Sequence, residues 1–334
     1  MANRTSRSTS QASDLPIEPE VSLIANEPMA EILDPPSSKK SKRLHLFGTV
    51  LTYASPSSNH RGKGDDTESP LQTITKQGRD LPVMSAYAIR SALRQMLIIE
   101  GLPSNRSRIN DGGAPKVEFK DFPNPDLYAD DFLFGFCVTD RAAVAAHPDR
   151  ASRRDSVFRN NMAVALSSDI NTHLQQAPRN TESSPWNNIK ETSLLYRQVI
   201  YTAYQYPFAL TRSDCLPKPK WTAALLKAIG QLNRVAGGDS VSHFQMGPRS
   251  IIIRLTPSLV AGYENYGFQE DVNFKELTRL INGELPGQEF WLGGEIVRKM
   301  PEDIKKKLED HQVHLIDSPQ KLLDEVSQKF LEGE

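Results

Sequence analysis

Alternating apolar and polar positions predict several β-strands along the 334-residue chain. Residues 44–53 alternate in this way and are rich in β-branched and aromatic side chains, which is typical of a strand. The same pattern predicts a strand over 71–75, one or two strands over 193–210, and a strand over 250–256. Residues 132–139 form a further compact apolar segment.

Apolar residues at helical spacing predict a helix over 86–100. Ser85 precedes it and is a favourable N-cap, while Gly101 follows it and ends it. The predicted buried stripe contains Ile89, Leu93 and Met96. Further helices are predicted for residues 222–235, 274–281, 301–307 and 317–331.

The order of these elements predicts an α+β fold with helices on one face of an antiparallel sheet. Long insertions leave this core after Tyr53, Gly101 and Thr139. Residues 1–42 are rich in Ser, Pro, Glu and Lys, and we expect a disordered arm there. Residues 301–334 are expected to form a C-terminal helical segment.

Composition is that of a globular protein, with 38% apolar and 24% charged residues and no apolar run of the roughly 20 residues that span a bilayer. Cys137 and Cys215 lie outside any CxxC motif, which favours a reducing compartment, a cytoplasmic location and no structural zinc.

Charge is distributed unevenly although the net charge is −1. Residues 141–159 contain five Arg and two Asp, and residues 301–334 contain nine acidic residues and five Lys. A local basic groove for nucleic acid is therefore compatible with a nearly neutral chain.

Four groups of residues are candidates for binding a polyanion. Each has an ordinary alternative as a solvated turn, a surface charge or a helix C-cap. The groups are the cationic loop with Asn59, His60, Arg61 and Lys63; the helix start with Ser85, Arg90 and Arg94; the basic stretch with Arg150, Arg153, Arg154 and Arg159; and the turn with Gly237, Gly238, His243 and Gln245. Helix N-termini and Arg side chains bind phosphates without reading bases.

The sequence motifs for a catalytic or metal-binding site are weaker than those for binding a polyanion. Asp65, Asp66 and Glu68 can hold Mg²⁺ or act on an RNA 2′-hydroxyl, but they also balance the neighbouring cations. His311 and His314 have metal-ligand spacing without an evident third ligand. No GxSxG motif or reactive-Cys signature is present, so no catalytic residue, metal site or cofactor is assigned.

Five segments occur in a recognisable order: the strand 44–52, the loop 59–61, the turn and helix 81–94, DFLFGF at 131–136 followed by RRDS at 153–156, and AGG at 236–238 ahead of GPRSII at 247–252. Taken in this order, they resemble the Cas-seven family of CRISPR-associated proteins, the repeated backbone subunit of type I Cascade, in its DevR-like (type I-A/I-B) branch. Three departures from the family pattern are Ala86 in place of Gly, Val157 in place of Pro, and Met84 in place of a β-branched residue.

The resemblance implies an RRM-like (ferredoxin-like) palm over residues 43–300, with finger loops at about 54–70 and 103–128 and a thumb-like segment at about 140–190. It also implies a non-catalytic subunit that polymerises along guide crRNA and presents the spacer to target DNA. The residues implied to hold phosphates are His60, Arg61, Arg90 and Arg94, with Ser85 at the helix start. Arg153, Arg154 and Arg159 are implied to lie in a mobile segment, and Gly237 and Gly238 to allow close approach.

The implied partners are crRNA, target DNA, further copies of the chain and the guide-processing, small and large Cascade subunits, with transposition proteins added in a transposon-associated variant. No membrane partner is expected. Two alternatives remain open: a metal-dependent ribonuclease of the same superfamily that uses Asp65, Asp66 or Glu68, and a transcriptional autoregulator, for which no helix-turn-helix signature is present.

Overall fold

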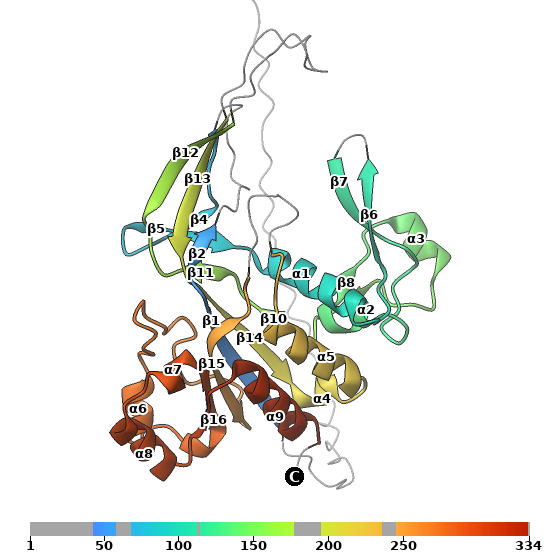
Figure 1. The fold of residues 1–334 in the computed structure, drawn as a ribbon. Helices are drawn as coiled ribbons and strands as arrows, with labels where there is room; N and C mark the ends of the chain where they lie inside the picture. Colours follow the sequence, from blue (N-terminus) through green and yellow to red (C-terminus); the bar gives the residue numbers. More distant parts are fainter. Residues whose placement is uncertain (1–42, 58–67, 112–113, 177–194, 236–244, 333–334) are drawn as a thin grey trace, which may run out of the picture. The chain divides into compact units, whose positions relative to one another are not determined.

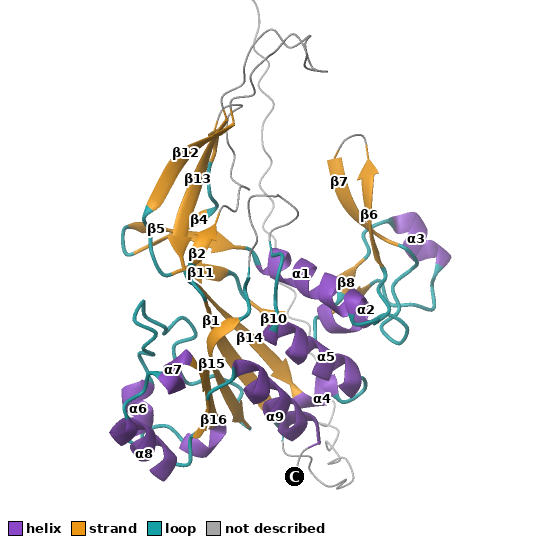
Figure 2. Cartoon of the chain, viewed as in Figure 1, coloured by secondary structure: helices purple, strands orange, loops and turns teal. Residues whose placement is uncertain are grey.

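The computed structural model describes residues 43–57, 68–111, 114–176, 195–235 and 245–332. Its central element is a nine-stranded sheet (Figures 1 and 2). The strand order is β17-β16-β15-β1-β14-β11-β5-β4, and β10 also pairs with β14. The bounds are β1 His45–Thr52, β4 Thr73–Lys76, β5 Arg79–Met84, β10 Arg159–Asn160, β11 Ala163–Ala165, β14 Tyr204–Thr211, β15 Pro248–Thr256, β16 Phe290–Gly294 and β17 His314–Ile316.

The centre of this sheet is built from a βαββαβ run of elements. With the inserted elements between them left out, the order along the chain is β1, α1 (Ala86–Ile99), β11, β14, α5 (Pro219–Gly230) and β15. The sheet order of its four strands is β15-β1-β14-β11, and each neighbouring pair is antiparallel. This connectivity is the one that defines ferredoxin-like units. The α+β class predicted from the sequence is confirmed.

Strand β1 shows why the sheet has a buried layer on each side. Leu46 and Val50 join the apolar cluster that contains α1 and α5, while Leu51 joins a second cluster on the opposite face. This division follows from the alternation of side chains along a strand. A glycine is required in the middle of β1, because a Cβ on Gly48 would lie 2.4 Å from the ring of Phe208 on β14.

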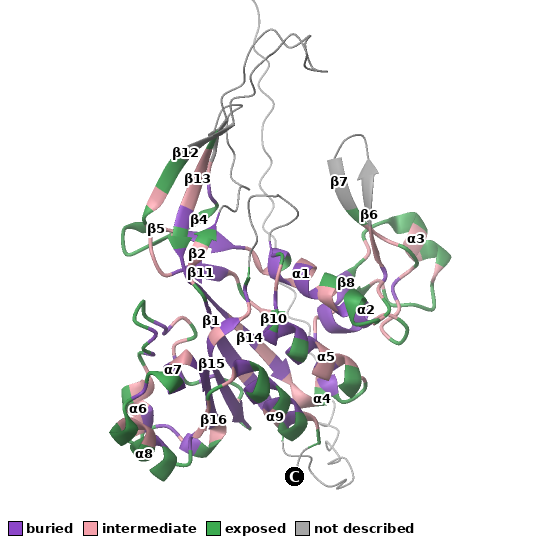
Figure 3. Ribbon diagram, in the orientation of Figure 1, coloured by how far each residue is buried: buried purple, intermediate pink, exposed green. Residues whose placement is uncertain are grey.

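Helices cover both faces of the sheet, so the predicted one-sided arrangement is wrong (Figure 3). The apolar residues that follow β15 fold back over the second face, which strand periodicity alone does not reveal. The first face carries α1, α2 (Ala129–Phe134), α5 and α9 (Pro319–Glu332), and the second carries α6 (Leu277–Ile281), α7 (Glu295–Arg298) and α8 (Glu302–Asp310). Two shorter helices are α4 (Arg212–Cys215) and the 3-10 helix Gly287–Glu289.

The inserted segments form smaller sheets. A second sheet has the order β12-β13-β2, with β3 on β13, and comprises β2 Ser55–Ser57, β3 Glu68–Ser69, β12 Ile170–Gln176 and β13 Leu195–Thr202. Two further pairs are β6 (Arg106–Asp111) with β7 (Ala114–Phe119), and β8 (Phe136–Cys137) with β9 (Arg153–Arg154). Helix α3 spans Arg141–Ala146.

The Arg-rich stretch predicted as one thumb-like segment over 140–190 is divided among three sheets. Its β9 pairs with β8, its β10 and β11 are strands of the large sheet, and its β12 belongs to the second sheet. Residues 159–165 are thus part of the central scaffold. None of the helices in the described ranges is long and apolar enough to cross a membrane.

The C-terminal helix α9 belongs to the main core. It contacts α5, β15 and β16, and its Leu322, Val326 and Phe330 are fully buried. Arg212 Nη2 also donates a hydrogen bond to the Leu331 carbonyl (3.3 Å), which ties the end of α9 to α4.

We predict that Phe330→Ala lowers the free energy of unfolding by about 3–5 kcal/mol, because it leaves a cavity between α9 and the sheet. Urea denaturation followed by circular dichroism measures this change. Lys321→Ala, an exposed change on the same helix, is the control and should stay within about 0.5 kcal/mol. Equal stability of the two variants would contradict the packing of α9.

Candidate nucleic-acid interface

The candidate interface begins where β5 passes into α1. Met84 at the end of β5 pairs with Ala163 on β11, and the chain turns at Ser85 into the helix. Ser85 has extended backbone angles, and its Oγ accepts a hydrogen bond from the Ala88 N–H (3.1 Å). The N-cap predicted for Ser85 is confirmed. The first turn of α1 contains no acidic residue, so its positive dipole end is not neutralised by a side chain of that turn.

Arg90, one turn into α1, joins the helix to β10. Its Nε donates to Asn160 Oδ1 (2.6 Å) and its Nη2 to the Phe158 carbonyl (3.1 Å). Asn160 in turn donates to the Ala86 carbonyl (3.4 Å). Partial burial lowers the pKa of Arg90 by desolvation, but a guanidinium remains charged at neutral pH. The cation is therefore held in place with its charge intact.

Arg94 has a different environment from Arg90, although both lie on α1. Its side chain is only 16% exposed, and its Nε lies 3.3 Å from Oδ2 of Asp130, which is 1% exposed. Desolvation lowers its pKa, and the neighbouring Asp130 opposes that shift. Arg94 also lies over the Phe134 ring, 5.1 Å from its centroid. Arg94 is thus paired with a carboxylate inside the protein, and the phosphate contact expected for it stays a prediction.

The carboxylates of Asp130 and Asp131 anchor the inserted segment as well. Asp130 accepts hydrogen bonds from the Asn105 backbone N–H (2.9 Å) and from Ser104 Oγ (3.0 Å). Asp131 pairs with Arg106 Nη1 at 2.7 Å. These bonds fix the base of the β6–β7 hairpin against α1 and α2.

Three basic residues of the Arg-rich stretch have unlike roles. Arg154 donates to the Phe132 carbonyl (2.5 Å) and lies 4.9 Å from the centroid of the Phe132 ring, so it is structural. Arg153, its neighbour on β9, is exposed, and so is Arg150. No ion pair joins Arg150 or Arg153 to another residue in the described part of the chain. Arg154 is thus bound to α2, while the mobile segment expected for Arg153 and Arg154 stays a prediction.

Arg159 points outward from the central sheet. It lies on β10, opposite Ala209 of β14, and 64% of its side chain is exposed. Its nearest acidic partner is Asp214, at 3.8 Å and also exposed, which is a weak contact in water. Arg159 is therefore an exposed cation on a strand of the central sheet, and the mobile segment expected for it stays a prediction.

Tyr87 lies beside Ser85 and Arg90 at the start of α1, and the sequence analysis did not name it as a candidate. It follows Ser85 by two positions and precedes Arg90 by three, so it lies on the same side of α1 as Arg90. Its side chain is 80% exposed. The spacing from the N-cap and from Arg90 was a signal that could have identified it. We name the surface formed by Ser85, Tyr87, Arg90 and Asn160, together with the neighbouring β10 residue Arg159, the α1–β10 strip; the Arg159 side chain itself extends toward Asp214 of α4.

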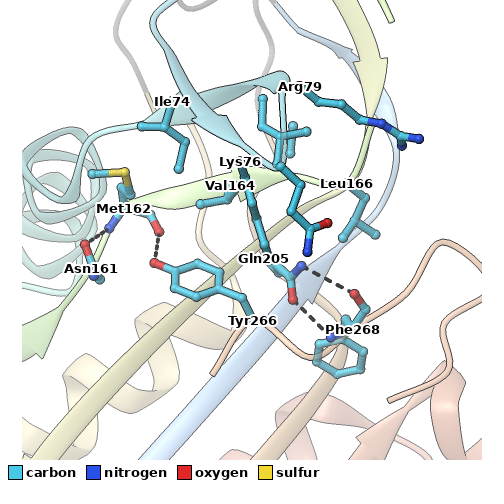
Figure 4. A pocket seen from close by; sticks show the side chains of 13 residues that line it. Ile74, Lys76, Arg79, Asn161, Met162, Val164, Leu166, Gln205, Tyr266 and Phe268 are labelled. Atoms are coloured by element: carbon cyan, nitrogen blue, oxygen red, sulfur yellow. Dashed lines mark hydrogen bonds between the residues drawn. The ribbon is translucent and has the colours of Figure 1, made fainter. Parts of the chain in front are cut away.

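A pocket of about 630 Å³ adjoins the strip (Figure 4). Asn161 and Met162, directly after the strip residue Asn160, form part of its lining. Lys76 and Arg79 of the β4–β5 hairpin also line it, which extends the positive charge beyond α1.

The remaining predicted residues are placed as follows. Gln245 is exposed and forms an isolated bridge with Asn233. Seven predicted RNA-binding residues lie outside the described residues: Asn59, His60, Arg61, Lys63, Gly237, Gly238 and His243. The same holds for Asp65 and Asp66 and for the side chain of Glu68.

The paired histidines do not assemble a metal site. His314 stacks on Trp291 with ring centroids 3.8 Å apart, and the His311 ring lies against Gly283. Among the described residues, no group of three or more His, Cys, Asp or Glu side chains is arranged to hold a metal ion.

Comparison with known proteins gives one curated relative and several related folds, while no protein-family model matches. The relative, from Myxococcus xanthus (strain DK1622), is named "CRISPR-associated protein Cas7/Cst2/DevR". It is 27% identical over 288 residues, which cover 81% of this chain and 93% of that protein. The resemblance to the Cas-seven family predicted from the motifs is confirmed.

Solved structures share the fold at low sequence identity. A chain of a "CRISPR RNA-guided surveillance complex, pre-nicking" has a TM-score of 0.56 at 11% identity, over 86% of this chain and 100% of that chain. A chain of a "CRISPR RNA-guided surveillance complex" has a TM-score of 0.53 at 12% identity, over 85% and 98%.

The buried Arg94 and the exposed Arg159 should differ in their effect on stability. We predict that Arg94→Ala lowers the free energy of unfolding by about 3–5 kcal/mol, because the buried Asp130 then keeps only the longer 3.9 Å contact to a cation, Arg106 Nη1. Arg159→Ala should change it by less than about 0.5 kcal/mol. Urea melts of both variants test this, and a neutral Arg94→Ala would contradict the internal role given to Arg94.

Proposed function

We propose that this chain, which resembles the Cas7/Cst2/DevR proteins over most of its length, is a guide-RNA-binding backbone subunit of a CRISPR surveillance complex. In this role copies of the chain polymerise along the crRNA and leave the spacer bases available to pair with target DNA. The subunit binds the crRNA and orders it along the complex, and no chemical step is assigned to the subunit. Its partners are crRNA, other copies of itself and other subunits of a Cascade-type complex in the cytoplasm.

The observation that carries the proposal is the extent of the likeness to the Myxococcus protein. The match spans 81% of this chain and 93% of that protein, so the similarity is not confined to a single motif or insertion. The relative's name assigns it to CRISPR, and we carry that assignment over to this chain as a proposal.

The chemistry of the α1–β10 strip supports a backbone-binding role. The strip offers a helix N-terminus, an anchored guanidinium on Arg90 and an exposed guanidinium on Arg159. These groups bind phosphate by charge and by N–H donors, and they contain no base-reading pattern. A protein that must accept any spacer sequence needs this kind of contact.

The free chain should bind single-stranded RNA with an affinity that depends on length and little on sequence. Each phosphate that Lys or Arg neutralises releases about 0.7 of a counterion from a single strand. The logarithm of Kd should therefore rise linearly with the logarithm of the salt concentration, and the slope gives the number of phosphates that the protein contacts. Fluorescence anisotropy over a salt series measures this slope. Co-expression with a guide array should also yield a high-mass ribonucleoprotein. Recovery of only an RNA-free monomer would contradict the proposal.

Charge reversal at exposed positions should weaken this binding without unfolding the chain. We predict that Arg153→Glu with Arg159→Glu lowers RNA affinity at least tenfold, about 1.4 kcal/mol, and reduces the salt slope. Lys321→Glu with Lys329→Glu on α9 is the matched control for net charge and should leave affinity nearly unchanged. Equal losses in both pairs would show a non-specific charge effect and place the RNA elsewhere.

The ribonuclease alternative predicts a different outcome with the same material. Incubation of labelled RNA with Mg²⁺ should leave the RNA intact if the chain only binds it. Cleavage that disappears in Asp65→Ala with Asp66→Ala would replace the proposed role by the enzymatic one.

A further inference from the structure

The side chain of Asn160, on β10, joins two points at the beginning of α1. Its Oδ1 accepts a hydrogen bond from Arg90 Nε (2.6 Å), and its amide nitrogen donates to the Ala86 carbonyl (3.4 Å). Ala86 and Arg90 are four positions apart, so they lie one turn from each other on the same side of the helix. The Asn160 amide therefore has a fixed orientation, with its oxygen toward the guanidinium and its nitrogen toward the helix backbone.

The backbone that carries Asn160 is held by the core. Asn160 lies opposite Phe208 of β14, and two positions before it the Phe158 side chain is fully buried. The centroids of the Phe158 and Phe208 rings are 6.0 Å apart. The Phe158 carbonyl accepts a second hydrogen bond from Arg90, from Nη2 at 3.1 Å. Both acceptors of the Arg90 side chain thus belong to one short stretch of chain that is anchored in the central sheet.

These two hydrogen bonds leave one end of the Arg90 guanidinium open. A guanidinium has five N–H donors, of which one on Nε is taken by Asn160 and one on Nη2 by the Phe158 carbonyl. Arg90 forms no further side-chain hydrogen bond within the described residues, so three N–H donors remain, all on Nη1 and Nη2. A phosphate can therefore approach end-on, through both terminal nitrogens, whereas the side with Nε is occupied.

The Arg90 charge is oriented without being neutralised. Asn160 is uncharged, and no carboxylate forms an ion pair with Arg90 in the described ranges. Arg94, one turn further along α1, is by contrast paired with Asp130. An Arg side chain that is already ordered loses less conformational entropy when it binds a ligand. Asn160 thus leaves Arg90 both cationic and prearranged.

We propose that Asn160 is a positioning residue, which holds the Arg90 guanidinium end-on toward one phosphate of the bound RNA. The inference rests on the proposed function and adds to it the residue that sets the geometry of one backbone contact. Asn160 acts through Arg90, because its amide oxygen is already used by Arg90 and its amide nitrogen by Ala86. The contact distinguishes no base, since only a phosphate is bound.

A double-mutant cycle in the full chain tests whether Asn160 acts through Arg90. The affinity for a fluorescent oligouridine is measured for Asn160→Ala, Arg90→Ala and the double variant, at a temperature where circular dichroism shows each to be folded. We expect about a fivefold loss for Asn160→Ala, the size expected when one long side chain must be ordered on binding, and about a tenfold loss for Arg90→Ala. The double variant should match Arg90→Ala, because the amide then has no guanidinium to orient. Losses that multiply would show that Asn160 acts on its own and would overturn the inference.

Arg90→Lys separates charge from geometry. A lysine keeps the charge but has no planar fork for the two acceptors to hold, so about the same fivefold loss is expected, with no further loss when Asn160→Ala is added. Wild-type affinity in Arg90→Lys would show that charge alone suffices and would contradict the positioning role. Asn282→Ala is the control and should bind as wild type does, because Asn282 is an exposed residue at the end of α6 whose amide donates to Glu284.

The salt dependence of binding gives a readout that a folding defect does not change. Arg90→Ala should lower the slope of log Kd against the logarithm of the salt concentration by about 0.7, which corresponds to one phosphate contact. An unchanged slope in Arg90→Ala would remove the phosphate contact of Arg90, and with it the role of Asn160, and leave the proposed function standing. Failure of the wild-type chain to bind oligouridine would remove the proposed function itself.

Discussion

The position of helix α1 is the constraint on which the candidate interface depends. Ile89 and Leu93 bury one side of the helix against the sheet, and Arg90 ties its first turns to β10. Arg94 then ties its later turns to Asp130 on α2. Because β10 and β11 are strands of the same sheet, the start of α1, Arg159 and the pocket keep a fixed relation to one another. A polyanion meets a surface that is already assembled.

The basic residues around α1 are divided by burial into two classes. Arg94, Arg106 and Arg154 hold inserted segments against the core through carboxylates or carbonyls. Arg150, Arg153 and Arg159 face solvent and would supply the charge for the proposed RNA contact. Buried ion pairs add little net stability, since desolvation offsets their attraction, but removing one partner is costly. Their value here is the placement of the β6–β7 hairpin and α2 relative to α1.

Much of the scaffold could be predicted from local patterns. The N-cap at Ser85, the helix after it and the strands near 45–52 and 248–256 follow from spacing and turn chemistry that act within a few residues. The short strands β10 and β11 could not be predicted, because each is only two or three residues long and is defined by pairing with distant β14 and β5. Helices α6 and α8 were predicted over 274–281 and 301–307, but their place on the second face was not, because the chain after β15 returns to a surface that the sequence pattern leaves unspecified.

The candidate site was predictable only in part. Arg90 and Arg94 look alike in sequence, and what separates them is a contact between Arg94 and Asp130, which is 36 positions away. Tyr87 was identifiable from its spacing to Ser85 and Arg90, whereas the pocket requires three segments to meet.

Hydrogen–deuterium exchange with and without guide RNA tests the central claim most directly. We expect RNA to slow exchange of backbone amides over 84–90 and 159–166 and to leave α9 unchanged. Protection confined to α5 and α9, with none at the α1–β10 strip, would contradict the account.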